Sequence, residues 1–187
     1  MRLCRCLPVL GLLLPVLATA HNFDIGHRVP PVLITDDGEL RLEHGQIHYS
    51  PWKSTELAGK IRVVQYIAGR TSAKNKNALL IQAIKRARFP SDRFQPTTIV
   101  NTDDAIPGSG FFVRRKVEKN KRRYPWAQFI IDSDGLARRA WQLKAASSTI
   151  LVLDQQGRIQ WVKDGALTPD EVARLLAQVH HLLDQQQ

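Results

Sequence analysis

The residues best suited to chemistry lie in the segment VVQYIAGRTSAKNKN, residues 63–77. An apolar run ends at Gly69 and a polar stretch of helical character begins at once, which is the layout of a site at the carboxyl end of a strand. The segment contains no cysteine, histidine or acid. Its chemistry must therefore come from hydroxyls and bases, which are Arg70, Thr71, Ser72 and Lys74.

Two roles are open for this turn. The backbone N–H groups of a helix start attract anions, and Arg70 and Lys74 would add charge to a carboxylate or phosphate site. Alternatively, Thr71 or Ser72 caps the helix and the bases are solvated. Catalysis would need an activated nucleophile, and the local combination that offers one is the Thr71 hydroxyl with Lys74 as its base.

An acidic pair follows the next β-branched run. If that run is a parallel neighbour of the preceding strand, Asp103 and Asp104 lie at the same edge of the sheet as Thr71. The pair could then hold a cation or form a salt bridge with Arg70. The alternative is a capped turn into the following loop, because aspartate is common in turns.

The densest charge in the chain is a run of bases, in which seven of the ten residues from 114 to 123 are Lys or Arg. Such a run is either a solvated helix face or an anion-binding patch. The neighbouring Tyr124 and Trp126 could stack on a ligand, lie at a membrane interface or be buried. The bases of this patch are Arg114, Arg115, Lys116, Lys119, Lys121, Arg122 and Arg123.

The N-terminus has the pattern of an export signal. Two arginines precede an apolar core at residues 7–17, and residues 18–20 form a small-x-small cleavage site. The core is shorter than the roughly 20 residues of a membrane span. We therefore expect residues 1–20 to be cleaved as a signal peptide, and residues 21–187 to form a single periplasmic domain without a transmembrane segment.

Cleavage would remove Cys4 and Cys6, the only cysteines in the chain. The mature protein would then lack a thiol, which excludes thiol redox chemistry, a disulfide and a thiolate metal site. Its net charge would fall only from +10 to +8. The expected partners are therefore an acidic protein or an anionic surface, such as lipid or lipopolysaccharide head groups, whereas export argues against nucleic acid.

The new N-terminus allows one metal hypothesis. A terminal amine and the imidazole of His21 together can bind copper, with His27, His44 or His48 as a further ligand. Nothing in the sequence brings these histidines together, and no other cofactor is expected.

Apolar runs alternate with amphipathic stretches, which predicts an α/β sandwich with a mixed central sheet flanked by helices. Strands are expected over residues 29–42 (interrupted by a turn at 36–38), 61–68, 97–102, 129–132, 149–153 and 158–163. Helices are expected over residues 71–88, 111–121 and 136–143, and from Thr168 onward. Residues 49–52 are expected to be a loop.

Longer segments resemble the thioredoxin-like fold in its exported forms. STELAGKIRVVQYIAGRTSAK resembles that group's buried strand and active-site turn, and SSTILVLDQQGRIQWVKDGALTPDEVARLL resembles its closing hairpin and last helix. More narrowly, AGRTSAKNKN, NTDDAIPGSG, YPWAQFI and KDGALTP resemble the YtfJ family of exported bacterial proteins. The resemblance covers residues 21–184, and it implies a fold and a compartment but no activity.

The same resemblance identifies what is missing. Thr71 stands where the attacking cysteine of a Cys-x-x-Cys site would be, Lys74 where the resolving one would be, and Ser148 where thioredoxins keep a cis-proline. We therefore expect a non-redox binding or scaffold protein with the sheet edge and the basic patch as contact surfaces. An enzyme that uses Thr71 and Lys74, or a metal-binding module at His21, remains the alternative.

Overall fold

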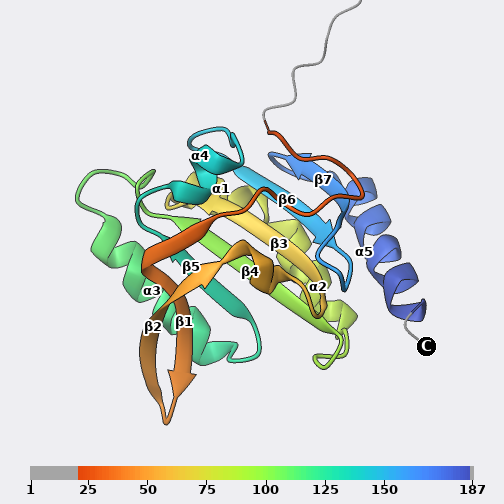
Figure 1. The fold of residues 1–187 in the computed structure, drawn as a ribbon, viewed down its shortest axis with the longest axis horizontal. Coiled ribbons are helices and arrows are strands. Elements are labelled where there is room, and N and C mark those ends of the chain that lie inside the picture. The colour runs from red at the N-terminus through yellow and green to blue at the C-terminus, as the bar shows by residue number, and fades with distance from the viewer. Residues whose placement is uncertain (1–20, 186–187) are drawn as a thin grey trace, which may run out of the picture.

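The computed structural model describes residues 21–185, so the predicted signal peptide lies outside the described residues (Figure 1). Its strands are β1 (Leu33–Glu43), β2 (Gln46–Lys53), β3 (Ile61–Ala68), β4 (Phe94–Asn101), β5 (Gln128–Asp132), β6 (Ser148–Leu153) and β7 (Ile159–Asp164). Its helices are the 3₁₀ helix η1 (Ser54–Leu57) and the α-helices α1 (Thr71–Lys76), α2 (Ala78–Ala87), α3 (Gly110–Arg123), α4 (Leu136–Ala140) and α5 (Pro169–Asp184).

All seven strands form one mixed sheet in the order β2-β1-β5-β4-β3-β6-β7. The three central strands β5, β4 and β3 are parallel, and the strands outside them pair antiparallel. Parallel neighbours need a crossover, and α1 with α2, and then α3, supply the two crossovers. The predicted α/β sandwich with a mixed sheet is confirmed.

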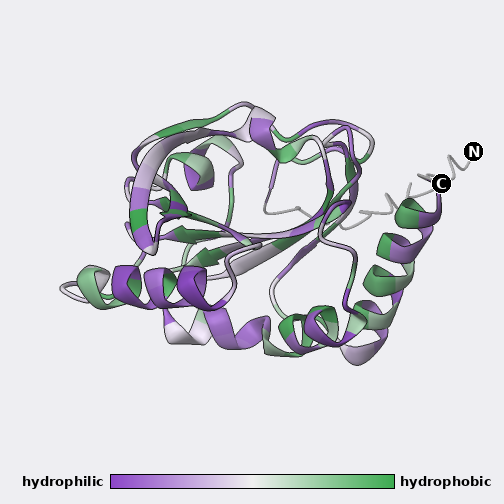
Figure 2. Ribbon diagram, turned by 90° about the horizontal axis from the view of Figure 1, so that it is seen from below, coloured by the Kyte–Doolittle hydropathy of each residue, from purple (hydrophilic) through white to green (hydrophobic). Residues whose placement is uncertain are grey.

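Helices cover the two faces of the sheet unequally. α2 and α5 pack on the face that carries Val63 and Ile150, and α3 packs on the same face against Phe129 and Ile131. Figure 2 shows these helices along the lower side of the molecule. The other face is covered by α4 and the N-terminal segment. Trp141, at the end of α4, is fully buried in the core on this face.

Two local predictions in the first hairpin were wrong. The turn expected at 36–38 is a bulge inside a continuous β1, where Asp37 and Gly38 both have positive φ and the register with β2 shifts. A side chain at Gly38 would meet the carbonyl oxygen of Ser50 at 2.2 Å. Residues 49–52 belong to β2 rather than to a loop, because proline is tolerated in an edge strand and Trp52 alternates into the core.

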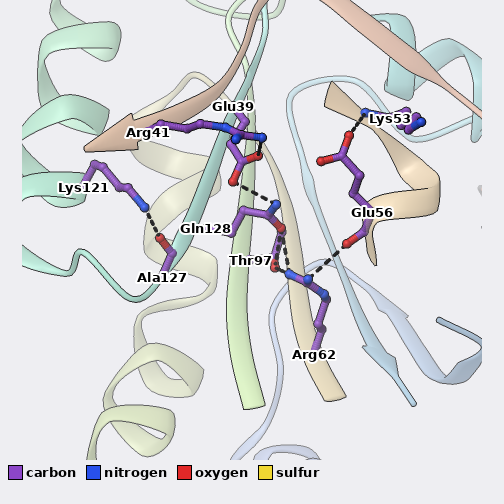
Figure 3. Close-up of polar contacts among 9 residues, drawn as sticks. All are labelled: Glu39, Arg41, Lys53, Glu56, Arg62, Thr97, Lys121, Ala127 and Gln128. Atoms are coloured by element: carbon purple, nitrogen blue, oxygen red, sulfur yellow. Dashed lines mark hydrogen bonds and ion pairs between the residues drawn. The ribbon is translucent and has the colours of Figure 1, made fainter. Parts of the chain in front are cut away.

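A buried cation joins four strands on the face opposite α3 (Figure 3). Arg62 of β3 is 5% exposed, and it donates to Thr97 Oγ1 at 2.9 Å and to Gln128 Oε1 at 2.8 Å. It also donates to the Leu57 and Glu56 carbonyls of η1, and Gln128 continues the chain of bonds to Glu39 of β1. Burial lowers the pKa of this guanidinium to about 10, against the opposing effect of two nearby glutamates, so the group stays charged at neutral pH.

Replacing this guanidinium should be costly. We expect Arg62→Met to lower the free energy of unfolding by roughly 3 kcal/mol, because the buried Leu57 carbonyl and the buried oxygens of Thr97 and Gln128 lose their donor. The matched control is Arg139→Met, which removes an exposed arginine with one backbone bond and should cost less than about 0.5 kcal/mol. Urea unfolding measures both, and equal losses would contradict the role given to Arg62.

Candidate functional site

The site begins where β3 and β4 end side by side. The amide of Gly69 donates to the Asn101 carbonyl at 2.7 Å. A Cβ at Gly69 would lie 2.9 Å from that carbonyl oxygen, so glycine is required for this close approach. The two segments that follow these strands, from Arg70 and from Thr102, therefore start at one edge of the sheet, as the sequence predicts.

Arg70 and Asp104 close this edge with an ion pair. Arg70 Nε donates to the Asp104 carbonyl at 2.7 Å, and Nη2 lies 3.3 Å from Asp104 Oδ1. Asp104 also accepts a hydrogen bond from the backbone amide of Ala146. Of the roles left open for the acidic pair, which were a cation site, a salt bridge and a capped turn, Asp104 takes the salt bridge. The side chain of Asp103 is exposed.

The hydroxyls and Lys74 point to solvent at the start of α1. The N-cap residue is Arg70, which makes no side-chain capping bond, so the expected cap by Thr71 or Ser72 is wrong. Thr71, Ser72 and Lys74 are exposed, and no hydrogen bond joins Thr71 to Lys74 in residues 21–185. A hydroxyl nucleophile needs a base in contact, and this arrangement provides none.

The predicted helix 71–88 breaks at Asn77 into α1 and α2, and this break fixes the turn to the sheet. Asn77 is 1% exposed, donates to Gln65 Oε1 at 3.2 Å and accepts from Ser148 Oγ at 3.0 Å. Lys76 Nζ lies 3.3 Å from Ser147 Oγ. Ser148, expected as a contact residue, is therefore buried as a structural partner of Asn77. The sequence could have indicated that Asn77 is buried. It lies three and four residues before Leu80 and Ile81, so it falls on the same face of the predicted helix as those apolar side chains.

A groove of about 890 Å³ separates α2 from α3 above the sheet. Its floor and walls include the apolar side chains of Ile67, Ile84, Val100, Val113 and Phe129. Six bases line it and no acid does, among the described residues: Arg70, Lys74, Lys85, Arg88, Lys116 and Arg123. The turn and two bases of the basic patch, Lys116 and Arg123, thus face one groove although they are separate in the sequence.

One contact crosses the far end of this groove. Lys85 Nζ of α2 donates to the Tyr124 hydroxyl at 2.9 Å and lies 4.7 Å from the centre of its ring. This hydrogen bond lowers the pKa of the Tyr124 phenol. Lys85 and Arg88 were not expected as site residues, although they continue the spacing of Ile81 and Ile84 along one face of α2.

The basic patch does not act as one surface. Lys121 is 8% exposed, and its ammonium donates to the Pro125 and Ala127 carbonyls at 2.9 and 3.0 Å, while burial lowers its pKa. Arg114 pairs with Asp37, and Arg122 donates to the Gly45 carbonyl. Arg114 and Arg122 therefore tie α3 to β1 and to the β1–β2 turn, and Lys121 ties the end of α3 to the loop that follows it. The bases whose side chains remain exposed are Arg115, Lys116, Lys119 and Arg123, together with the surface-lying Arg122.

A buried acid on the opposite face has a structural role. Asp132 is fully buried and accepts from the Tyr66 hydroxyl at 2.9 Å and from the amides of Leu136 and Ala137 at 2.7 and 3.0 Å. Burial raises its pKa, and these hydrogen bonds act in the opposite direction. Both oxygens accept hydrogen bonds, from the first amides of α4 and from the Tyr66 hydroxyl, so this carboxyl is not open to a ligand.

The structure assembles no metal site within residues 21–185, where no three His, Cys, Asp or Glu side chains are grouped to hold an ion. His21 instead accepts a hydrogen bond from the amide of Phe23 at 3.3 Å and packs against the Phe23 ring. Within the same range, no helix has the length and apolar character needed to cross a membrane.

The neighbouring acids at this edge provide a matched pair for mutagenesis. We expect Asp104→Asn to lower the free energy of unfolding by about 1–2 kcal/mol, because it discharges the partner of Arg70 and weakens the bond to Ala146. Asp103→Asn should stay within about 0.5 kcal/mol of the parent. Urea unfolding gives both values, and hydrogen exchange at the Ala146 amide should speed up in Asp104→Asn alone. Equal effects would contradict the ion pair's role.

The chain is similar in sequence to two bacterial proteins over nearly its whole length. The chain is 59% identical over 183 residues to "Uncharacterized protein YtfJ" of Escherichia coli (strain K12), covering 98% of this chain and all of that one. It is 37% identical over 174 residues to an "Uncharacterized protein" of Haemophilus influenzae (strain ATCC 51907 / DSM 11121 / KW20 / Rd), covering 93% and 95% of the two chains.

Among solved structures, the chain is similar to a thioredoxin-like superfamily protein, with a TM-score of 0.55 and 17% identity over 84% of this chain and 96% of that one. This likeness shows the thioredoxin-like fold. Residues 23–182 match the family described as "Bacterial protein of unknown function (YtfJ_HI0045)". The chain therefore belongs to the YtfJ_HI0045 family of bacterial proteins.

Proposed function

We propose that this protein is a non-redox binding protein that holds an acidic, partly apolar segment of a partner protein in the groove between α2 and α3. The observation that carries the proposal is the composition of the groove, where, among residues 21–185, an apolar floor is bordered by six bases and by no acid. Such a lining favours a ligand that is apolar on one side and anionic on the other.

The shape of the groove supports an extended ligand. It runs from Arg70 and Thr71 at the carboxyl edge of the sheet to Tyr124 and Trp126 at the other end. Trp126 is 55% exposed, and an exposed aromatic at the rim of an apolar site is a common binding anchor. Apolar contacts along the floor would supply affinity, and the bases would select acidic segments and speed their association.

The residues at the turn support binding over catalysis. Residues 21–187 contain no cysteine. The resemblance to thioredoxin-like proteins implies that Thr71 and Lys74 stand where a Cys-x-x-Cys pair would be. Both side chains are exposed and available to a ligand in the groove. The turn then contributes charge and a hydroxyl to a contact surface instead of a redox centre.

The binding site can be tested with a synthetic peptide in which glutamate and leucine alternate. We expect its addition to shift backbone amide signals of α2 and α3 in NMR spectra. Lys85→Glu combined with Arg123→Glu should weaken binding about tenfold or more, because two favourable charges become repulsive. Binding should also fall as salt rises, since exposed charges are screened.

The control variant reverses two exposed arginines away from the groove, Arg158→Glu and Arg174→Glu, and makes the same change in net charge. It should bind the peptide as the parent does, apart from a small long-range effect. Equal weakening in both variants, or no shifts in α2 and α3, would remove the groove as the binding site.

We further propose that the protein works in the periplasm after cleavage before His21, which the export pattern of residues 1–20 supports. Protein purified from exporting cells should then have the mass of residues 21–187 and take up no iodoacetamide, because Cys4 and Cys6 have left with the signal. It should not reduce insulin disulfides. Turnover by this cysteine-free protein would show that the non-redox assignment is wrong.

A further inference from the structure

Three large apolar side chains are exposed at the tip of α3, that is, at the start of the helix and in the loop just before it. Ile106 of the preceding loop is 57% exposed, and Phe111 and Phe112 of the first helical turn are 60% and 71% exposed. The two phenylalanine rings contact each other edge to face, with centres 5.7 Å apart. Large apolar side chains that are clustered and exposed mark an interaction surface.

The charge behind this tip has one sign. Phe112, Arg115 and Lys119 are spaced by three and four residues, so they share a face of α3, and all three are exposed. Arg115 also lies over the Phe111 ring, 5.1 Å from its centre. The acid of this helix, Glu118, points inward and accepts a hydrogen bond from the Tyr49 hydroxyl at 2.7 Å.

This face is distinct from the groove. The groove is lined by Val113, Lys116, Val117 and Asn120, which lie on the side of α3 that packs toward the sheet. Figure 2 shows α3 at the left edge of the molecule, with a green apolar first turn followed by purple polar turns. The apolar tip therefore stands at the periphery, with its bases behind it.

We propose that this tip docks the protein on the surface of a bilayer that contains anionic phospholipid. Phe111, Phe112 and Ile106 enter the boundary between head groups and acyl chains, and Arg115 and Lys119 meet the lipid phosphates. At 1.5 Å per residue, these bases lie about 4–10 Å behind Phe112 along the helix axis. That separation matches the roughly 5–10 Å depth of interfacial insertion.

The favoured partner is a lipid surface because the patch is small and lies at an edge. A stable protein interface buries about 800 Å² on each partner, with apolar groups surrounded by polar ones. Three side chains at the end of a helix supply far less area. A combination of exposed phenylalanines and bases of one sign is what peripheral membrane attachment needs.

Vesicle sedimentation tests this docking. The protein should bind vesicles of phosphatidylcholine with phosphatidylglycerol and bind vesicles of phosphatidylcholine alone far less, and added salt should weaken the binding. Phe111→Ser combined with Phe112→Ser should weaken binding to the anionic vesicles about 100-fold, at about tenfold for each ring removed from the interface.

The matched control removes two apolar side chains of similar exposure elsewhere, Ile25→Ser and Leu33→Ser, which are 58% and 55% exposed in the parent. It should bind the anionic vesicles as the parent does. No binding by the parent, full binding by the phenylalanine variant, or an equal loss in the control would each overturn the proposal. Thermal unfolding of both variants checks that the fold is kept.

Insertion itself has a separate readout. An indole introduced by Phe112→Trp should be quenched by lipids brominated in their acyl chains, beyond the quenching of the parent's own tryptophans. Binding without this added quenching would mean that the bases alone attract the protein to the surface, and the proposed insertion would be wrong. The peptide experiment on the groove is independent of this result, so either proposal can fail without the other.

Discussion

The fold depends on the hydrogen bonds of one buried guanidinium, that of Arg62. Arg62 lies in the central strand β3, and moving a cation out of water is costly unless its N–H groups are hydrogen-bonded to acceptors within the protein. Those acceptors come from η1, β4 and β5, and Gln128 passes the network on to β1. Elements distant in the sequence are thereby held in one register, because a shift of any strand would leave buried polar groups unpaired.

The same principle positions the candidate site on the other face. Asn77 interrupts the helix after β3, and its amide is bonded to Gln65 of β3 and Ser148 of β6. The short α1 is thus fixed at the sheet edge, where Arg70 is held by Asp104. The turn is therefore held at the end of β3, and it presents a threonine and a lysine there.

The bases of α3 have different structural roles. Lys121 and Arg114 have partners within the protein, where they hold the end of the helix and the bulge of β1. Lys116 and Arg123 face the groove, and Arg115 and Lys119 lie on the exposed faces. A single basic run therefore supplies structural cations, a groove lining and an outer surface, because successive residues of a helix point in different directions.

Much of the fold was predictable from local patterns. The buried strand before Gly69, the hairpin after residue 148 and the helix that begins after Thr168 have signals within a few residues, and the structure confirms them. The pairing of Arg70 with Asp104 was one of three roles considered for the acidic pair, since two parallel strand ends must meet at one edge. The spacing of bases likewise predicted that α3 would be strongly charged.

Other features were decided only by tertiary contacts. The bulge at Asp37 and Gly38 has the sequence of a turn, and β2 contains a proline, so local signals pointed away from strands that pairing stabilises. Lys121 and Ser148 carry polar groups that would suit a surface, but packing buries both side chains. Lys121 donates to two carbonyls just beyond the end of α3, and Ser148 is bonded to Asn77, 71 residues away in the sequence. The groove exists because α2 and α3 pack apart on one sheet, and no local pattern encodes a distance between two helices. The sequence alone determined which residues could bear the chemistry, and packing determined which of them face a common space.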